Sequence, residues 1–195
     1  MSNQKNPVVL VHGIHDTIAV FDKMYNYLTN LGWSVYRFNL IPNSGMAELN
    51  ELAKTVDNYI NRTFKPDEKI DLIGFSMGGL VTRYYLQRMG GLKKVQRYIN
   101  ISAPNHGTLT AYVLNYAGIL QMRYDSPFLK DLNSDVEVLN NIDLTVLWTP
   151  FDLMILPADS TQLFLGKEIK IPVLFHPWML TDDRVLNIIK DSLSS

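Results

Sequence analysis

Short apolar runs rich in Val, Ile and Leu alternate along this chain with longer segments whose apolar residues recur at helical spacing. Such alternation is typical of strand–helix–strand units around a parallel sheet whose two faces are covered. Strands are expected at residues 7–11, 34–40, 69–74, 95–102, 144–149 and 169–175. The sequence therefore predicts an α/β fold with a mainly parallel six-stranded sheet flanked by helices.

The longer segments predict four helices, at residues 17–30, 46–64, 77–89 and 182–193. The last helix is expected to start after Thr181, which is a favourable N-cap residue. Residues 105–141 are less regular, and we expect a short, irregular helical insertion there that borders the functional site. Because it has few residues to spare, the site should be open, with little or no lid.

The 195 residues suit one domain, residues 1–195, since single domains commonly have roughly 100 to 200 residues. No cysteine is present, which excludes disulfides, cysteine-based metal sites and thiol nucleophiles. The formal net charge of −1 provides no long-range attraction for nucleic acid. We expect a monomer that binds no nucleic acid.

Residues 98–122 contain no charged side chain, and their number is sufficient to span a bilayer. Polar residues and Pro104 interrupt the stretch, so no transmembrane segment is predicted. The polar start, Met1-Ser-Asn-Gln-Lys-Asn, lacks the pattern of a signal peptide, and a cytoplasmic location is expected.

Residues 74–78, Gly-Phe-Ser-Met-Gly, match the pattern Gly-x-Ser-x-Gly. An apolar strand is expected directly before them and a helix directly after, which is the context in which such a serine becomes a nucleophile. The alternative is that Ser76 only caps the helix in a glycine-rich turn. Pattern and context together favour the nucleophile.

Residues 74–86 resemble the nucleophile elbow of the α/β-hydrolase superfamily, and within it of bacterial lipases and esterases. Phe75 stands where those enzymes usually have histidine. The turn His12-Gly13-Ile14 after the first strand resembles the turn that supplies one oxyanion-hole amide there. The resemblance implies an α/β-hydrolase fold, with the backbone N–H groups of Ile14 and Met77 as oxyanion donors.

The same resemblance implies the order serine, acid, histidine for the remaining catalytic residues, which leaves His106 and His176 as bases. Asp152 follows an expected strand and precedes apolar residues and a proline, as the family's acid does. His176 lies between the last strand and the last helix, where the family keeps its base. His106 would border the site in a hydrogen-bonding role.

Two carboxylates compete with Asp152: Asp143 precedes its strand, and Asp159 lies beyond Pro157. His12, His15 and Asp16 also admit a reading as a metal cluster, but no further spaced ligand accompanies them. We therefore predict Ser76, Asp152 and His176 as the catalytic residues, with no metal ion or cofactor.

The predicted function is a serine carboxylic ester hydrolase, a lipase or esterase that cleaves lipid-like esters through an acyl-enzyme on Ser76. A thioesterase, acyltransferase or peptidase on the same scaffold is the first alternative, and a non-catalytic binding module the second. Apolar residues between Tyr112 and Phe128 are expected to contribute both to packing and to an acyl-binding wall.

The basic residues between Arg83 and Arg97 suggest a transient contact with a lipid interface, although helices usually present such charges to solvent. The solvated face is the expectation for these residues.

Overall fold

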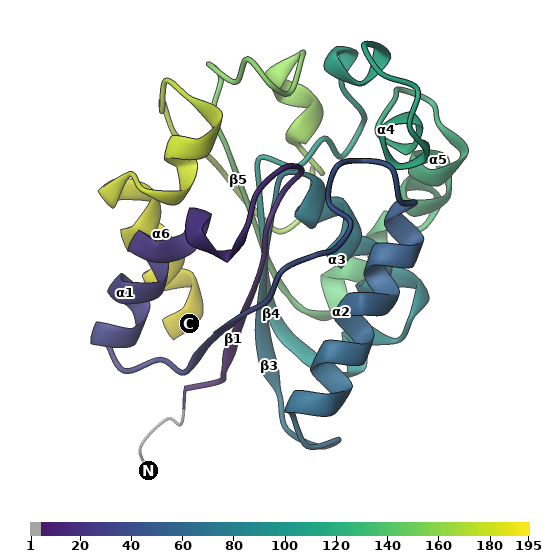
Figure 1. The fold of residues 1–195 in the computed structure, drawn as a ribbon. Helices are drawn as coiled ribbons and strands as arrows, with labels where there is room; N and C mark the ends of the chain where they lie inside the picture. The colour runs from purple at the N-terminus through teal and green to yellow at the C-terminus, as the bar shows by residue number, and fades with distance from the viewer. Residues whose placement is uncertain (1–4) are drawn as a thin grey trace.

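The computed structural model describes residues 5–195, which form one parallel sheet with helices on both faces (Figure 1). The six strands within these residues are β1 (Val8–Val11), β2 (Val35–Arg37), β3 (Ile70–Phe75), β4 (Val95–Ile101), β5 (Asp143–Trp148) and β6 (Lys167–Lys170). They are arranged in the order β2-β1-β3-β4-β5-β6, and every neighbouring pair is parallel. The predicted α/β architecture is confirmed.

The helices connect these strands. The α-helices are α1 (Asp22–Asn30), α2 (Leu49–Thr63), α3 (Met77–Arg88), α4 (Ala117–Gln121), α5 (Pro127–Ser134) and α6 (Asp183–Ser194). Short 3-10 helices are η1 (Ile18–Phe21), η2 (Gly91–Lys93), η3 (Leu109–Tyr112), η4 (Val136–Asn141), η5 (Ala158–Thr161) and η6 (His176–Leu180). Residues 105–141 thus consist of two short α-helices between two 3-10 helices.

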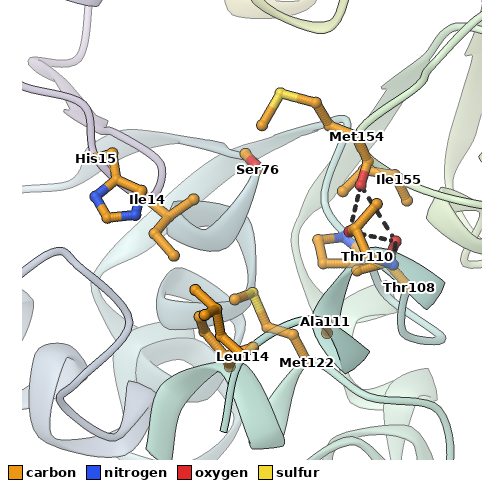
Figure 2. Close-up of a pocket in the computed structure, with 12 residues that line it drawn as sticks. Ile14, His15, Ser76, Thr108, Thr110, Ala111, Leu114, Met122, Met154 and Ile155 are labelled. Carbon is orange, nitrogen blue, oxygen red and sulfur yellow. Dashed lines mark hydrogen bonds between the residues drawn. The ribbon is translucent and has the colours of Figure 1, made fainter. Parts of the chain in front are cut away.

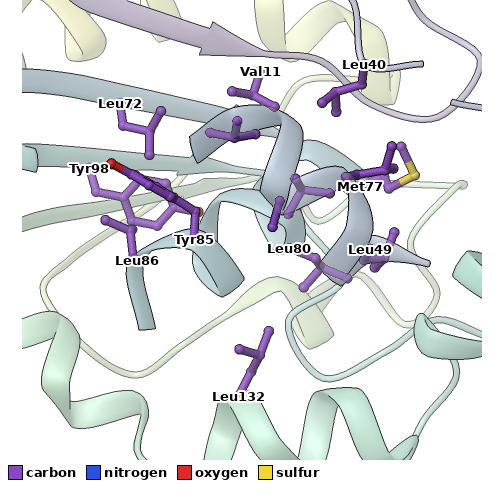
Figure 3. Packing of buried hydrophobic residues seen from close by; sticks show 14 of the residues in the cluster. Val11, Leu40, Leu49, Leu72, Met77, Leu80, Tyr85, Leu86, Tyr98 and Leu132 are labelled. Atoms are coloured by element: carbon purple, nitrogen blue, oxygen red, sulfur yellow. The ribbon is translucent and has the colours of Figure 1, made fainter. Parts of the chain in front are cut away.

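Two buried apolar clusters cover the two faces of the sheet. Helices α2 and α3 lie on one face, and α1 and α6 on the other (Figure 1). Alternate strand residues point to opposite clusters: Val9 and Val11 pack with α2 and α3, whereas Val8 and Leu10 pack with α1 and α6. Figure 3 shows the first cluster from close by. Because both faces are buried, the strands have continuous apolar runs instead of alternating ones.

The last strand differs from the sequence prediction. Strand β6 ends at Lys170, whereas a strand over residues 169–175 was expected. The ladder stops because Pro172 has no N–H to donate. Ile171 still donates to the carbonyl of Trp148, and Val173 is held by the Thr149 hydroxyl, so the segment continues along the sheet edge towards His176.

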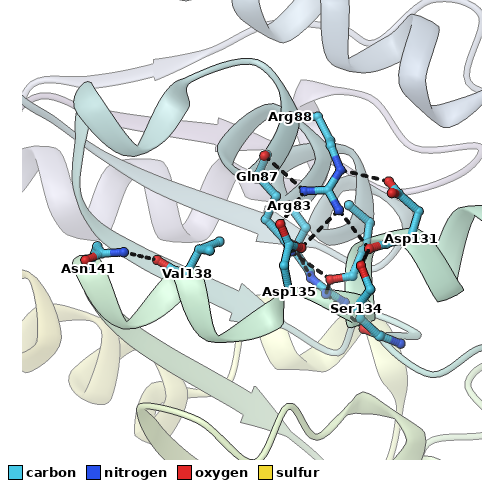
Figure 4. A network of polar contacts seen from close by, with 10 residues as sticks. Arg83, Gln87, Arg88, Asp131, Ser134, Asp135, Val138 and Asn141 are labelled. Atoms are coloured by element: carbon cyan, nitrogen blue, oxygen red, sulfur yellow. Dashed lines mark hydrogen bonds and ion pairs between the residues drawn. The ribbon is translucent and has the colours of Figure 1, made fainter.

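The expected solvated basic face is wrong for Arg83, which is fully buried. Its guanidinium donates to the side chain of Asn105 and to the Leu132 carbonyl, and burial lowers its pKa to about 10. Arg88, one turn further on, does form ion pairs, with Asp131 and Asp135 (Figure 4). The two arginines fasten α5 to α3 instead of forming a free basic surface.

The start of the last helix is also corrected. Asp182 is the N-cap of α6, and its carboxylate accepts from the Arg184 amide at 2.9 Å. Thr181, the expected cap, ends η6. An ionised carboxylate suits a helix N-terminus better than a hydroxyl because it also interacts favourably with the helix dipole.

The strand order sets the position of a site. The chain leaves β1 for β2 on one side of the sheet and leaves β3 for β4 on the other, so the direction of winding reverses between β1 and β3. Open α/β sheets bind ligands beyond the carboxyl ends of the strands at such a switch point. Across residues 5–195, the structure contains no helix with the length and apolar character needed to cross a membrane.

Candidate active site

Ser76 lies at the switch point, directly after β3 and at the N-cap of α3. Its backbone has a φ of 53° and a ψ of −126°, a conformation that side-chain-bearing residues rarely adopt. The two glycines make this turn possible. A Cβ on Gly78 would lie 2.4 Å from the carbonyl oxygens of Val11 and His12, and one on Gly74 would lie 2.3 Å from the Thr82 hydroxyl.

The turn after β1 lies against this serine. A Cβ added to Gly13 would be 3.0 Å from the Cβ of Ser76, so the two backbones approach as closely as glycine allows. The amide of His15 donates to the Asn43 carbonyl, whereas that of Ile14 has no acceptor among residues 5–195. The Met77 amide is in the first turn of α3, where amides have no intrahelical acceptor.

His12 holds this turn in place from beneath. Its Nε2 accepts a hydrogen bond from the Leu40 amide, and its Nδ1 donates to the Gly13 carbonyl, each at 2.9 Å. These partners require the neutral Nδ1–H tautomer, because an amide only donates and a carbonyl only accepts. Burial also lowers the pKa of His12. The residue is therefore structural, and the described residues hold no cluster of three potential metal ligands.

Asp152 and His176 are brought together by the segments that follow β5 and β6. The two side chains are buried, and Nδ1 of His176 donates to Oδ2 of Asp152 at 2.6 Å. The other oxygen, Oδ1, accepts from the amides of Met154 and Ile155 at 2.9 Å each. Three donors thus fix the carboxylate, which in turn fixes the imidazole.

The second ring nitrogen of His176 is free to accept a proton. Because Nδ1 carries the hydrogen directed at Asp152, Nε2 has the lone pair, and it has no partner within residues 5–195. The imidazole packs against Phe75, the residue before Ser76, with ring centroids 4.8 Å apart. The base candidate therefore lies beside the elbow, at the same edge of the sheet.

The competing candidates lack this arrangement. Asp143 and Asp159 are exposed. The imidazole of His106 pairs with no carboxylate in the described part of the chain, and its Nδ1 has only a 3.5 Å contact with Asn133. Its backbone amide donates to the Ser160 carbonyl, and His106 lines a separate cavity with Tyr124 and Asn133 instead of the cavity beside Ser76.

The sequence suggested Asp16 only as part of a metal cluster, and its position beside the elbow was not predicted. The ideal Cβ position on Gly13 is 3.1 Å from Oδ2 of Asp16, which places this carboxyl group next to the turn that faces Ser76. Burial raises its pKa. Its place four residues after His12 was the available signal, but the sequence alone did not show that the carboxyl group turns back towards Gly13.

A cavity opens beside Ser76 (Figure 2). Thr108, Thr110, Met154 and Ile155 lie on one side of it, and Ile14 and His15 on the other. Its far end is apolar and comes from the 105–141 segment. The lining consists of Ile14, His15, Ser76, Pro104, Thr108, Thr110, Ala111, Leu114, Ile119, Met122, Met154 and Ile155. The arrangement offers a serine hydroxyl, a nearby base and an apolar receptacle.

Comparison with solved structures shows the same fold. Lipase BlEst2 of Bacillus licheniformis in its mature form matches with a TM-score of 0.79 and 14% identity, over 98% of this chain and 93% of that one. An extracellular α/β-hydrolase of a Paenibacillus species matches with a TM-score of 0.67 and 17% identity, over 96% and 98% of the two chains. The fold is therefore that of the α/β-hydrolases.

Lipase B of Aspergillus fumigatus matches with a TM-score of 0.79 and 18% identity, over the whole of this chain but only 54% of that protein. The sequence itself matches a family model over residues 7–130, a range that includes the turn after β1, the elbow and α4. With well over half of its residues matched, the chain belongs to the palmitoyl protein thioesterase family, a group of hydrolases with a lipase-like fold.

Proposed function

We propose that the protein is a serine acyl hydrolase that cleaves carboxylic esters of lipid-like substrates through an acyl-enzyme on Ser76. The observation that carries the proposal is the buried Asp152–His176 pair, whose free Nε2 lies at the same sheet edge as Ser76. A serine hydroxyl is a weak nucleophile at neutral pH and needs such a base.

In the first half-reaction, Nε2 of His176 takes the Ser76 proton as Oγ attacks the ester carbonyl. Asp152 holds the tautomer and stabilises the imidazolium that forms. The proton then passes to the leaving alcohol as the bond between carbonyl carbon and alkoxy oxygen breaks. A water molecule repeats the sequence on the acyl-enzyme and releases the acid.

The oxyanion that forms in each step needs donors beside Ser76. We assign the amides of Ile14 and Met77 to this role, because the first has no acceptor among residues 5–195 and the second lies in the first turn of α3. The positive end of the α3 dipole adds to the stabilisation.

Thioesters are the second candidate substrates, favoured by the family to which the chain belongs. The two candidates differ in what they demand of His176. An alkoxide leaving group must be protonated, whereas a thiol with a pKa of about 8.5 departs readily as the anion. The same site serves both reactions, and the leaving group decides how far catalysis depends on the general acid.

A pair of substrates with one acyl group and either an oxygen or a sulfur leaving atom separates the candidates. For the ester hydrolase, the purified protein turns over the oxygen ester with a kcat/KM at least comparable to that of the thioester. Selective turnover of the thioester would assign the second function, and turnover of neither by a folded protein would end the proposal.

The surroundings of the cavity support a lipid-like substrate. Large apolar side chains are exposed near it on the 105–141 segment and on the loop after β5, among them Val113, Leu114, Leu153 and Met154. Exposed apolar side chains gathered near a cavity are typical of sites that meet apolar ligands or lipid surfaces. We include transient contact with a lipid interface in the proposal, through these apolar groups and not through basic residues.

A further inference from the structure

The cavity beside Ser76 has a closed far end. Ala111, Ile119 and Met122 line it there, and all three are buried members of the main apolar cluster. In Figure 2, Ala111, Leu114 and Met122 lie at the opposite side of the cavity from Met154 and Ser76. A ligand that extends from Ser76 into this end therefore meets the core itself.

The wall behind the cavity is held tightly. A Cβ on Gly45 would lie 2.6 Å from Cγ1 of Ile119, so no space remains behind that side chain. The Gly118 amide donates to the Gly45 carbonyl at 2.9 Å. At the other end of α4, the side chain of Gln121 accepts from the Leu49 amide at 2.6 Å. Helix α4 is thus fastened to the loop before α2 and to α2 itself, and it has little freedom to retreat.

The cavity beside Ser76 is small. Its volume is about 160 Å³, and an apolar protein cavity of about 150 Å³ accommodates benzene, which has six carbons. On this scale, a C16 acyl chain such as palmitoyl needs roughly two to three times this volume. Interiors are close-packed, so the excess cannot extend past the far end of the cavity without displacing core side chains.

Resting on the proposed function, we infer that the cavity of this protein recognises only about the first six carbons of an acyl group. Ile119 and Met122 set the limit as the floor of the cavity. Carbons beyond it leave the cavity at its open side, past Leu114, which is 43% exposed. The acyl length that the cavity holds thus differs from the palmitoyl group in the family's name.

A series of dissolved esters from C2 to C12 with one leaving group tests the inference. Each methylene that enters the cavity should raise kcat/KM about fourfold, and the rise should stop near C6. A kcat/KM that continues to rise from C6 to C12 would overturn the inference while leaving the proposed hydrolase intact. A folded protein that hydrolyses no member would overturn both.

Substitutions on α4 test which residue sets the limit on acyl length. Ile119→Ala should move the break in the series to longer chains by about two carbons, because it removes the branched floor. Its matched control is Leu120→Ala on the same helix, outside the lining and 40% exposed, which should leave the profile unchanged.

Leu114→Trp acts at the exposed side of the same cavity, so it does not depend on tolerance of a core substitution. It should narrow the cavity and lower the C6 to C2 ratio of kcat/KM about fifteenfold, since roughly two methylenes lose their place. An unchanged ratio in a folded Leu114→Trp protein would also contradict the inference.

Discussion

The turn after β3 and the turn after β4 contain the same unusual element, a serine with a left-handed backbone. Ser76 has a φ of 53° and Ser102 a φ of 45°, and both follow neighbouring strands at one edge of the sheet. Their surroundings differ. Ser76 lines the cavity, whereas Ser102 is completely buried and its hydroxyl has no partner in the part of the chain that the structure describes.

On the proposed function, the surroundings of the strained serine, and not the strain alone, make Ser76 the nucleophile. The β3 turn adds a helix that begins at Met77, an adjacent histidine and an opening to the cavity. The turn after β4 leads into irregular chain instead of a helix, and Ser102 itself does not line the cavity. The strained backbone at Ser76 places its side chain at the cavity. The strained backbone at Ser102 places a side chain in the interior, so we expect it only to lower the stability of the fold.

The largest expected effect separates the two serines directly. Ser76→Ala should lower kcat for ester hydrolysis by about 10⁵-fold or more, as loss of a triad serine does elsewhere, with the fold retained. Ser102→Ala is the matched control, and its kcat should stay within a few-fold of the wild type. Steady-state kinetics and circular dichroism measure both. Equal losses of kcat in the two variants would contradict the proposed difference between Ser76 and Ser102.

Asp152→Asn should have the next largest effect. An amide in place of the carboxylate no longer holds the tautomer of His176, which costs on the order of 10⁴ in kcat in a comparable triad. If the substrate is a thioester, the loss should be smaller because the leaving group needs less protonation. Asp159→Asn, at an exposed carboxylate, serves as control, and a larger loss there would reassign the acid.

A pH effect tests how the turn after β1, which lies against Ser76, is supported. Burial lowers the pKa of His12, so the unfolded chain takes up this proton first as the pH falls below about 6.5. The stability that neutral His12 contributes is therefore lost as the pH falls from this unfolded value through the folded one, at up to about 1.4 kcal/mol per pH unit.

Urea unfolding between pH 7.5 and pH 5 measures this loss. His12→Gln keeps an acceptor for the Leu40 amide but does not titrate, so its free energy of unfolding should depend less on pH than that of the wild type. His106, whose pKa is also lowered by burial, contributes equally to both proteins and cancels in the comparison. Identical pH dependence in the two proteins would rule out the role of His12.

The smallest expected effect is a gain in stability at the second serine. Ser102→Gly removes the side chain from a residue with a left-handed backbone, and with it a buried hydroxyl that has no partner among the described residues. The greater entropy of glycine in the unfolded chain opposes this gain in stability. The net gain should be about 1 kcal/mol, or roughly 2–4 °C in Tm. Thermal unfolding measures it, and a lower Tm would show that the hydroxyl has an unrecognised stabilising contact.

The sequence predicted those parts of the fold that depend on local pattern. The strand before Gly74 and the helix after it follow from adjacent apolar residues and glycines, and the parallel sheet follows from alternation. The burial of Arg83 could not be predicted, because its partners, Asn105 and Leu132, are 22 and 49 residues away. The end of β6 depends on one proline within an apolar run.

The candidate site, too, was predictable only where it depends on local sequence pattern. Order along the chain pointed to Ser76, Asp152 and His176, and the structure brings the last two within hydrogen-bonding distance. The size of the cavity was not predictable. The size depends on the contact between Ile119 and Gly45. These residues are far apart in the sequence, and no local pattern in either segment predicts that they meet.

Covalent labelling with an organophosphonate tests the central claim most directly, because the reagent needs an activated serine but no knowledge of the substrate. The account predicts one adduct per chain, located on Ser76 by mass spectrometry, with parallel loss of ester hydrolysis and no adduct on Ser76→Ala. An unlabelled protein, or an adduct on Ser102 or any other residue, would contradict it.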